Sequence, residues 1–281
     1  MHLKIWEAIV YGIIGGATEL LPTSFSGHVA VLRNAFHMSS LTDGGGFFVR
    51  AAICIGVFLA ITAAFAGETR VLGRELLLMT GIKKQKRGQS PDRILRRSIL
   101  LGMFALVPML CSLFFLAPAE RIERLLYIII FLVISGILLF CCCRGREGNK
   151  DEKTVTLRDM LLIGFSRMLS VFPGLSGFGA SIAVGRAVGL SKEYNLRLGC
   201  MLTQVLQIFL FFFYLIRGFI YGVFTADILL PMLFALIFSA VFGYLAIEYF
   251  RYLYQKDRLN IFVYYSAELA VIAAILALIN A

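Results

Sequence analysis

The run TELLPTSFSGH at residues 18–28 gathers side chains that can do acid–base chemistry in an otherwise apolar N-terminal region. It holds a carboxylate, Glu19, an imidazole, His28, and hydroxyl groups that include Ser24 and Ser26. Ionisable groups within a membrane are costly unless they are paired or hydrated, so they are functional candidates by default. We therefore predict a site with Glu19, His28 and Ser26 as its reactive groups. The alternative is one buried hydrogen bond that holds this segment together.

A second run, SVFPGLSGFGAS at residues 170–181, repeats the frame of apolar residues, a proline and a turn rich in small and hydroxyl side chains. Helix N-termini at such turns offer unpaired N–H groups and the positive end of the helix dipole, which suit an anion. Each serine has an alternative role as a helix cap, and each arginine an alternative position at the membrane interface. The candidate anion contacts are Ser24, Ser176, Gly177, Ser181, Arg50 and Arg186.

A carboxylate in an anion site calls for a divalent cation that bridges it to phosphate oxygens. Glu19 is therefore also the candidate metal ligand.

The elements that position these residues must be membrane helices. The chain has 281 residues, of which 59% are hydrophobic and 16% charged, and its mean hydropathy is +0.85. This composition is too apolar for a soluble domain. Because a bilayer core needs about 20 apolar residues per helix, six spans are predicted, at 46–66, 98–117, 125–143, 196–216, 228–250 and 261–281.

Two further apolar regions, 3–37 and 159–190, are broken internally by glycine and proline. Basic residues gather in the loops at 67–97, 144–158 and 251–260, which places these loops in the cytoplasm. Each broken region then begins and ends on one side of the membrane, so each is predicted to be a re-entrant helical hairpin. The prediction is a single all-α polytopic domain, 1–281, built as an inverted repeat of about 1–143 and 144–281, with its site near the midplane.

The formal net charge of +10 is explained by attraction of the basic loops to anionic lipid, so nucleic acid is not an expected partner. The six cysteines are interpreted as packing residues. For the run Cys141, Cys142 and Cys143, acylation or a soft metal is the alternative, although no neighbouring histidine or CxxC spacing supports it.

The two motifs resemble those of the undecaprenyl-diphosphate phosphatase family (BacA/UppP, the bacitracin-resistance type), whose second motif usually reads PGxSRSGAT. The resemblance covers most of the chain. It implies an enzyme of the bacterial plasma membrane, with a site open to the outside, that removes the terminal phosphate of the polyprenyl diphosphate released in peptidoglycan synthesis. It also implies a divalent cation, Mg²⁺ or Ca²⁺, held by Glu19, and it matches His28 to the family histidine. A homodimer is compatible with this reading.

The resemblance breaks at several polar positions. Gly15 replaces the first of two motif carboxylates, Phe25 replaces a serine with a suspected catalytic role, and Gly177 replaces the arginine expected to hold the diphosphate. Arg50 stands where members carry glutamate, and Cys54 where they carry glutamine. Two functions therefore stay open. One is a phosphatase in which Arg50 substitutes for the missing cation, and the other is a non-catalytic member that binds or flips a polyprenyl phosphate.

Overall fold

The computed structural model describes residues 3–42, 44–84, 92–120, 122, 124–145, 148–222 and 224–279, and the regular elements of these residues are all helices. Six of the helices are long and apolar enough to cross a membrane, which confirms the six predicted spans. They are α3 (Gly46–Ala64), α5 (Arg93–Ala119), α6 (Leu125–Arg144), α9 (Lys192–Tyr221), α10 (Leu229–Gln255) and α11 (Asn260–Ile279). The chain is therefore a multi-pass membrane protein.

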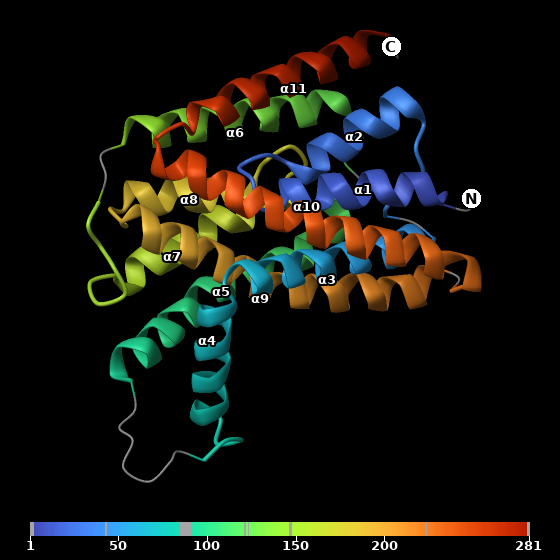
Figure 1. Ribbon diagram of the computed structural model, residues 1–281. Helices are drawn as coiled ribbons and strands as arrows, with labels where there is room; N and C mark the ends of the chain where they lie inside the picture. Colours follow the sequence, from blue (N-terminus) through green and yellow to red (C-terminus); the bar gives the residue numbers. More distant parts are fainter. Residues whose placement is uncertain are drawn as a thin grey trace.

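The two regions broken by glycine and proline each form a pair of short helices. In the first, α1 (Ile5–Thr18) and α2 (Phe25–Phe36) are joined by residues 19–24. In the second, α7 (Leu157–Met168) leads through the 3₁₀ turn η1 (Leu169–Val171) to α8 (Gly177–Ala187). Pro22 and Pro173 lie in the two connections, where a residue without a backbone N–H does not interrupt a helix. Figure 1 shows α1 and α2 toward one end of the bundle and α7 and α8 toward the other.

The helices pack in pairs that join the part of the chain before residue 145 to the part after it. In these pairs α1 packs on α10, α5 on α7, α3 on α9 and α6 on α11, and the last pair forms one layer at the top of Figure 1. A Cβ added at Gly16 would lie 2.4 Å from the backbone oxygen of Ser239. The α1–α10 contact is therefore made at backbone distance, which only glycine permits at this position.

The segment 67–97, predicted as a loop, is partly helical. It contains α4 (Ala66–Met79) and the first turn of α5, which begins before the predicted span because Asp92 caps it by accepting the Ile94 and Leu95 N–H groups at 3.0 Å. An ion pair of 2.6 Å between Arg96 and Glu75 joins the two helices. Together they project from the rest of the bundle (Figure 1).

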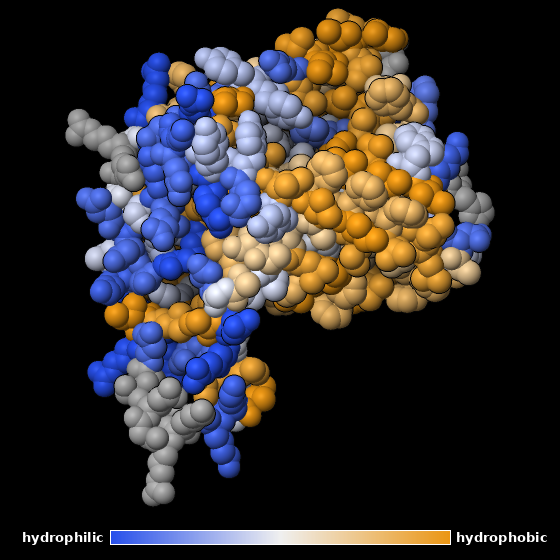
Figure 2. Space-filling model, viewed as in Figure 1, coloured by the Kyte–Doolittle hydropathy of each residue, from blue (hydrophilic) through white to orange (hydrophobic). Residues whose placement is uncertain are grey.

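The outer surface of the bundle is divided by polarity. Large apolar side chains are exposed on α5, α6, α10 and α11, among them Phe114, Ile137, Leu245 and Val271. Figure 2 shows a broad apolar face over the middle of the bundle, with hydrophilic side chains gathered at the end where α7 and α8 lie. An apolar surface of this extent fits contact with lipid.

Candidate active site

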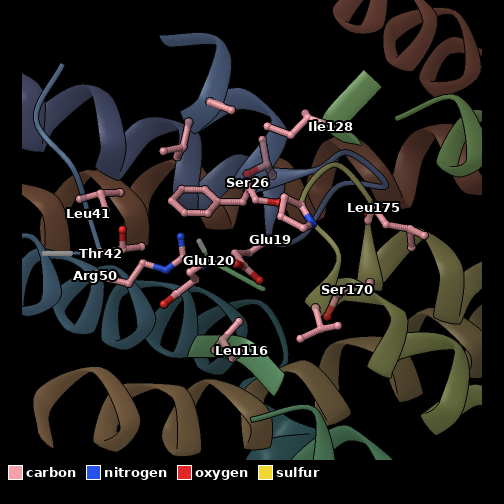
Figure 3. Close-up of a pocket in the computed structure, with 18 of the residues that line it drawn as sticks. Glu19, Ser26, Leu41, Thr42, Arg50, Leu116, Glu120, Ile128, Ser170 and Leu175 are labelled. Atoms are coloured by element: carbon pink, nitrogen blue, oxygen red, sulfur yellow. The ribbon is translucent and has the colours of Figure 1, made fainter. Parts of the chain in front are cut away.

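The connections between the paired short helices meet at a pocket of about 480 Å³, a volume typical of small-molecule sites. Figure 3 shows Glu19, Ser26, Arg50 and Ser170 directed toward this space from separate parts of the chain. The polar and glycine residues of its wall include Glu19, Thr23, Ser26, Arg33, Arg50, Glu120, Arg167, Ser170, Ser176 and Gly177.

Both connections end in a serine that caps the following helix. Ser24 Oγ accepts a hydrogen bond from the Gly27 N–H at 3.1 Å, and Ser176 Oγ accepts one from the Gly179 N–H at 3.1 Å. The capping role considered for these serines is therefore present, and of the two only Ser176 also lines the pocket. Because α2 and α8 both begin at the pocket wall, the positive ends of two helix dipoles face it.

The two connections also bind each other directly. The Gly174 N–H donates to Ser26 Oγ at 3.1 Å, and a Cβ added at Gly179 would lie 2.9 Å from Pro22 Cβ. Gly174 has φ of +106°, a conformation that favours glycine. The pocket is therefore built where two segments distant in sequence come into close contact.

Glu19 supplies a carboxylate to the pocket. Its backbone caps the C-terminal end of α1, and Gln207 of α9 donates from Nε2 to Glu19 Oε2 at 3.1 Å. The guanidinium groups of Arg50 and Arg167 are both close enough to attract this carboxylate electrostatically. Arginines on two different helices, α3 and α7, thus offset the negative charge of Glu19.

Arg50 is held by aromatic rings in the pocket. Its guanidinium carbon lies 4.0 Å from the centre of the Phe25 ring and 5.1 Å from that of Tyr214, distances that give cation–π attraction. The Tyr214 hydroxyl donates to Glu120 Oε1 at 2.8 Å, and Glu120 also pairs with Arg217. Phe25, at the position where the resemblance implies serine, thus orients a cation.

Arg167 of α7 is a buried cation of the pocket wall that the sequence analysis missed. It is 3% exposed, and its Nε has no hydrogen-bond partner among the described residues. Its Nη1 donates to Ser181 Oγ over a long 3.5 Å. The signal that could have found it is an arginine six residues before Pro173 in the broken apolar region 159–190, since an ionisable residue at membrane depth is a functional candidate.

His28 does not line the pocket with Glu19 and Ser26. Its Nδ1–H donates to the backbone oxygen of Ser24 at 2.6 Å, which fixes the tautomer in which Nε2 accepts from the Tyr265 hydroxyl at 2.6 Å. Its ring also stacks on that of Tyr265 in α11. These contacts match the alternative of a buried hydrogen bond that holds the segment together.

Ser181 and Arg186 also lie outside the pocket wall. Ser181 donates to the Phe178 backbone oxygen at 2.8 Å. Arg186 donates to the Gly145 backbone oxygen at 2.9 Å and pairs with Asp257 at 3.0 Å. Hydrogen bonds from Lys192 and then Arg186 hold the pKa of the Asp257 carboxyl below its ordinary value. Arg186 therefore ties α8 to the connections that follow α6 and α10.

The pocket offers few ligands to the expected Mg²⁺ or Ca²⁺. In the described part of the chain, no group of three or more His, Cys, Asp or Glu side chains is placed to share a metal ion. A Cβ added at Gly15 would lie 2.6 Å from Ile53 Cγ2, so this position has no room for the second carboxylate that the resemblance implies. These cations prefer several oxygen ligands. Of the two carboxylates in the wall, Glu120 is paired with Arg217, and Glu19 is attracted by the guanidinium groups of Arg50 and Arg167, so the pocket does not fit that preference.

Comparison with known proteins places the chain in a family. The family described as "Bacitracin resistance protein BacA" matches residues 8–272. A protein of Methanobrevibacter smithii named undecaprenyl-diphosphatase is 28% identical over 279 residues, 94% of each chain. A protein of the same name from Methanosphaera stadtmanae is 27% identical over 288 residues, 99% of each chain. One from Bifidobacterium adolescentis is 30% identical over 207 residues, 72% of this chain and 69% of the relative. The chain thus belongs to the bacitracin resistance protein BacA family.

Proposed function

We propose that the protein is an undecaprenyl-diphosphate phosphatase that binds the diphosphate of the lipid in this pocket and removes its terminal phosphate. The observation that carries the proposal is the carboxylate of Glu19 in a pocket whose wall also includes Arg33, Arg50 and Arg167 and the N-termini of two helices. Such a pocket suits a diphosphate anion. The relatives named undecaprenyl-diphosphatase support the choice of substrate.

Hydrolysis of a phosphoanhydride requires an activated nucleophile and stabilisation of the charge on the phosphoryl oxygens. In the proposed reaction Glu19 takes a proton from a water molecule, whose oxygen bonds to the terminal phosphorus. The bridging P–O bond breaks, and the products are the lipid monophosphate and inorganic phosphate. The Ser26 hydroxyl and the N-terminal N–H groups of α8 bind phosphate oxygens, while His28 keeps α2 in position.

We also propose that α1–α2 and α7–α8 are re-entrant hairpins of an inverted repeat. Their matching serine caps and the cross-pairing of the longer helices support this. The pocket wall includes Leu41 and Thr42, after α2, and Glu120, after α5. These positions lie on the side opposite the basic loops, so the site is proposed to open to the outside of the plasma membrane.

A second candidate function is binding or flipping of a polyprenyl phosphate without hydrolysis. The observation that favours it is the loss of reactive groups from the pocket. The ring of Phe25 occupies the position of a family serine, and both nitrogens of His28 are engaged outside the pocket wall.

One assay separates the two functions. Purified protein in detergent is incubated with undecaprenyl diphosphate, and phosphate release is measured for wild type, Glu19→Gln and Glu248→Gln. Loss of the general base in Glu19→Gln should lower the rate about 10²–10⁴-fold. Glu248 pairs with Arg251 outside the pocket, so its variant should retain the wild-type rate. Binding of the lipid without phosphate release by wild type would refute the phosphatase and support the carrier.

A further inference from the structure

The pocket contains buried polar atoms that the protein leaves without partners. Among the described residues, three buried side-chain nitrogen or oxygen atoms have no hydrogen-bond partner, and two of them, Arg167 Nε and Thr23 Oγ1, belong to the pocket wall. Leaving a buried charged group unsatisfied is expensive. An anion that accepts hydrogen bonds from Arg167 would remove this cost.

Arg167 lies beside the position where the resemblance implies the diphosphate-binding arginine. A Cβ added at Gly177 would lie 3.2 Å from the backbone oxygen of Arg167 and 2.5 Å from Ser170 Cβ. An arginine therefore does not fit at position 177 unless Ser170 moves. The guanidinium carbon of Arg167 lies 5.9 Å from the centre of the ring of Phe178, the residue after Gly177. The structure thus has a guanidinium group near this place, but it comes from α7 instead of the start of α8.

Arg50 provides a second guanidinium group from another wall. Its cation–π contacts with Phe25 and Tyr214 restrict its position, and it also acts on Glu19 electrostatically. A planar guanidinium group that is held in place loses little entropy when it binds phosphate through two parallel hydrogen bonds. Arg50 from α3 and Arg167 from α7 together therefore form an anion site with a guanidinium group from each of two helices.

The charge balance of the pocket argues against an additional divalent cation. The pocket wall carries three arginines, Arg33, Arg50 and Arg167, against two carboxylates, Glu19 and Glu120, which leaves a positive excess before any ligand binds. The second carboxylate position is closed by the contact of Gly15 with Ile53. A metal ion would be repelled by the guanidinium groups, and one of the two wall carboxylates, Glu120, is already paired with Arg217. A diphosphate is attracted by all of the positive groups.

We propose that Arg50 and Arg167 bind the diphosphate of the polyprenyl lipid in place of both the divalent cation and the motif arginine. Binding of the headgroup then requires no metal ion. This inference rests on the proposed function, because it concerns the same pocket and the same substrate class. It extends that function because the positive charges that bind the diphosphate come from Arg50 and Arg167, and not from a metal ion or from an arginine at position 177.

The test measures binding separately from hydrolysis. The probe is an undecaprenyl diphosphate analogue whose bridging oxygen is replaced by CH₂, so that it cannot be hydrolysed at that bond. Its Kd for the purified full-length protein in detergent is determined in EDTA, in Mg²⁺ and in Ca²⁺. We expect equal affinity in the three conditions. Arg167→Gln and Arg50→Gln should each raise Kd about 10- to 100-fold, the effect of losing a charge-assisted hydrogen bond.

Arg251→Gln is the matched control, because Arg251 pairs with Glu248 outside the pocket wall and its loss should leave Kd unchanged. Arg167→Lys keeps the charge without the forked geometry and should fall between wild type and Arg167→Gln. Size-exclusion chromatography establishes that each variant is folded, and Arg50→Gln carries the test if Arg167→Gln does not fold. Binding by wild type only with metal, or binding in EDTA that neither substitution weakens, would overturn this inference and leave the proposed function intact. Failure of wild type to bind in all three conditions would overturn the proposed function itself.

Discussion

Replacing Gly177 by alanine tests how tightly the start of α8 packs against η1. The new Cβ would lie 2.5 Å from Ser170 Cβ and 2.9 Å from Ser170 Oγ, whereas ordinary contact begins at 3.4 Å. Neither atom is the end of a long flexible side chain, so the backbone of η1 or α8 must move. Overpacking of this kind costs about 1–3 kcal/mol. For a chain of this size that corresponds to a fall in Tm of about 2–5 °C.

The assay is thermal unfolding of the purified variant in detergent, followed by circular dichroism. Gly73→Ala in α4 is the control, because a Cβ there meets no atom within 4 Å and alanine favours a helix by about 1 kcal/mol over glycine. In a Ser170→Gly background, Gly177→Ala should cost less than in wild type, because the clashing atoms are gone. A Gly177→Ala variant as stable as wild type, or an equal loss in both backgrounds, would refute this account of why position 177 has no side chain.

Two further substitutions test contacts that hold the site in place. Tyr265→Phe removes the hydroxyl that donates to His28 Nε2 and should cost about 1 kcal/mol of stability. Phosphate release per folded molecule should stay at the wild-type level. A large loss of rate at unchanged Tm would instead place His28 in the reaction. Gly16→Ala puts a Cβ 2.4 Å from the Ser239 backbone oxygen, so it should reduce the yield of folded protein measured by size-exclusion chromatography, whereas Gly102→Ala, with open space around it, should not.

The membrane helices were predictable because each depends on a local property. A run of about 20 apolar residues is enough to indicate a span, and each of the six predicted spans contains a membrane-length helix among its described residues. Their ends were less predictable, because a capped polar turn extends a helix beyond its apolar core. Asp92 does this for α5. The helix α4 was not predicted because it is amphipathic and, at 14 residues, too short to cross the membrane.

The site was predictable in its location but only partly in its membership. The chemistry of the motifs identified Glu19, Ser26 and Ser176, and all three line the pocket. Sequence did not fix which way each side chain turns after a proline break, so it grouped His28 with Glu19 although the imidazole is directed to α11. It also offered Arg50 without Arg167, because the closeness of α7 to the pocket depends on packing between distant segments.

The most direct test of the central claim is a cryo-EM structure of the protein with the non-hydrolysable undecaprenyl diphosphate analogue bound. We expect both phosphate groups to lie in the pocket at the starts of α2 and α8, in contact with the guanidinium groups of Arg50 and Arg167, and the carboxylate of Glu19 to face the terminal phosphorus. Phosphate density at the other end of α8, beside Arg186, or anywhere outside the pocket, would contradict it.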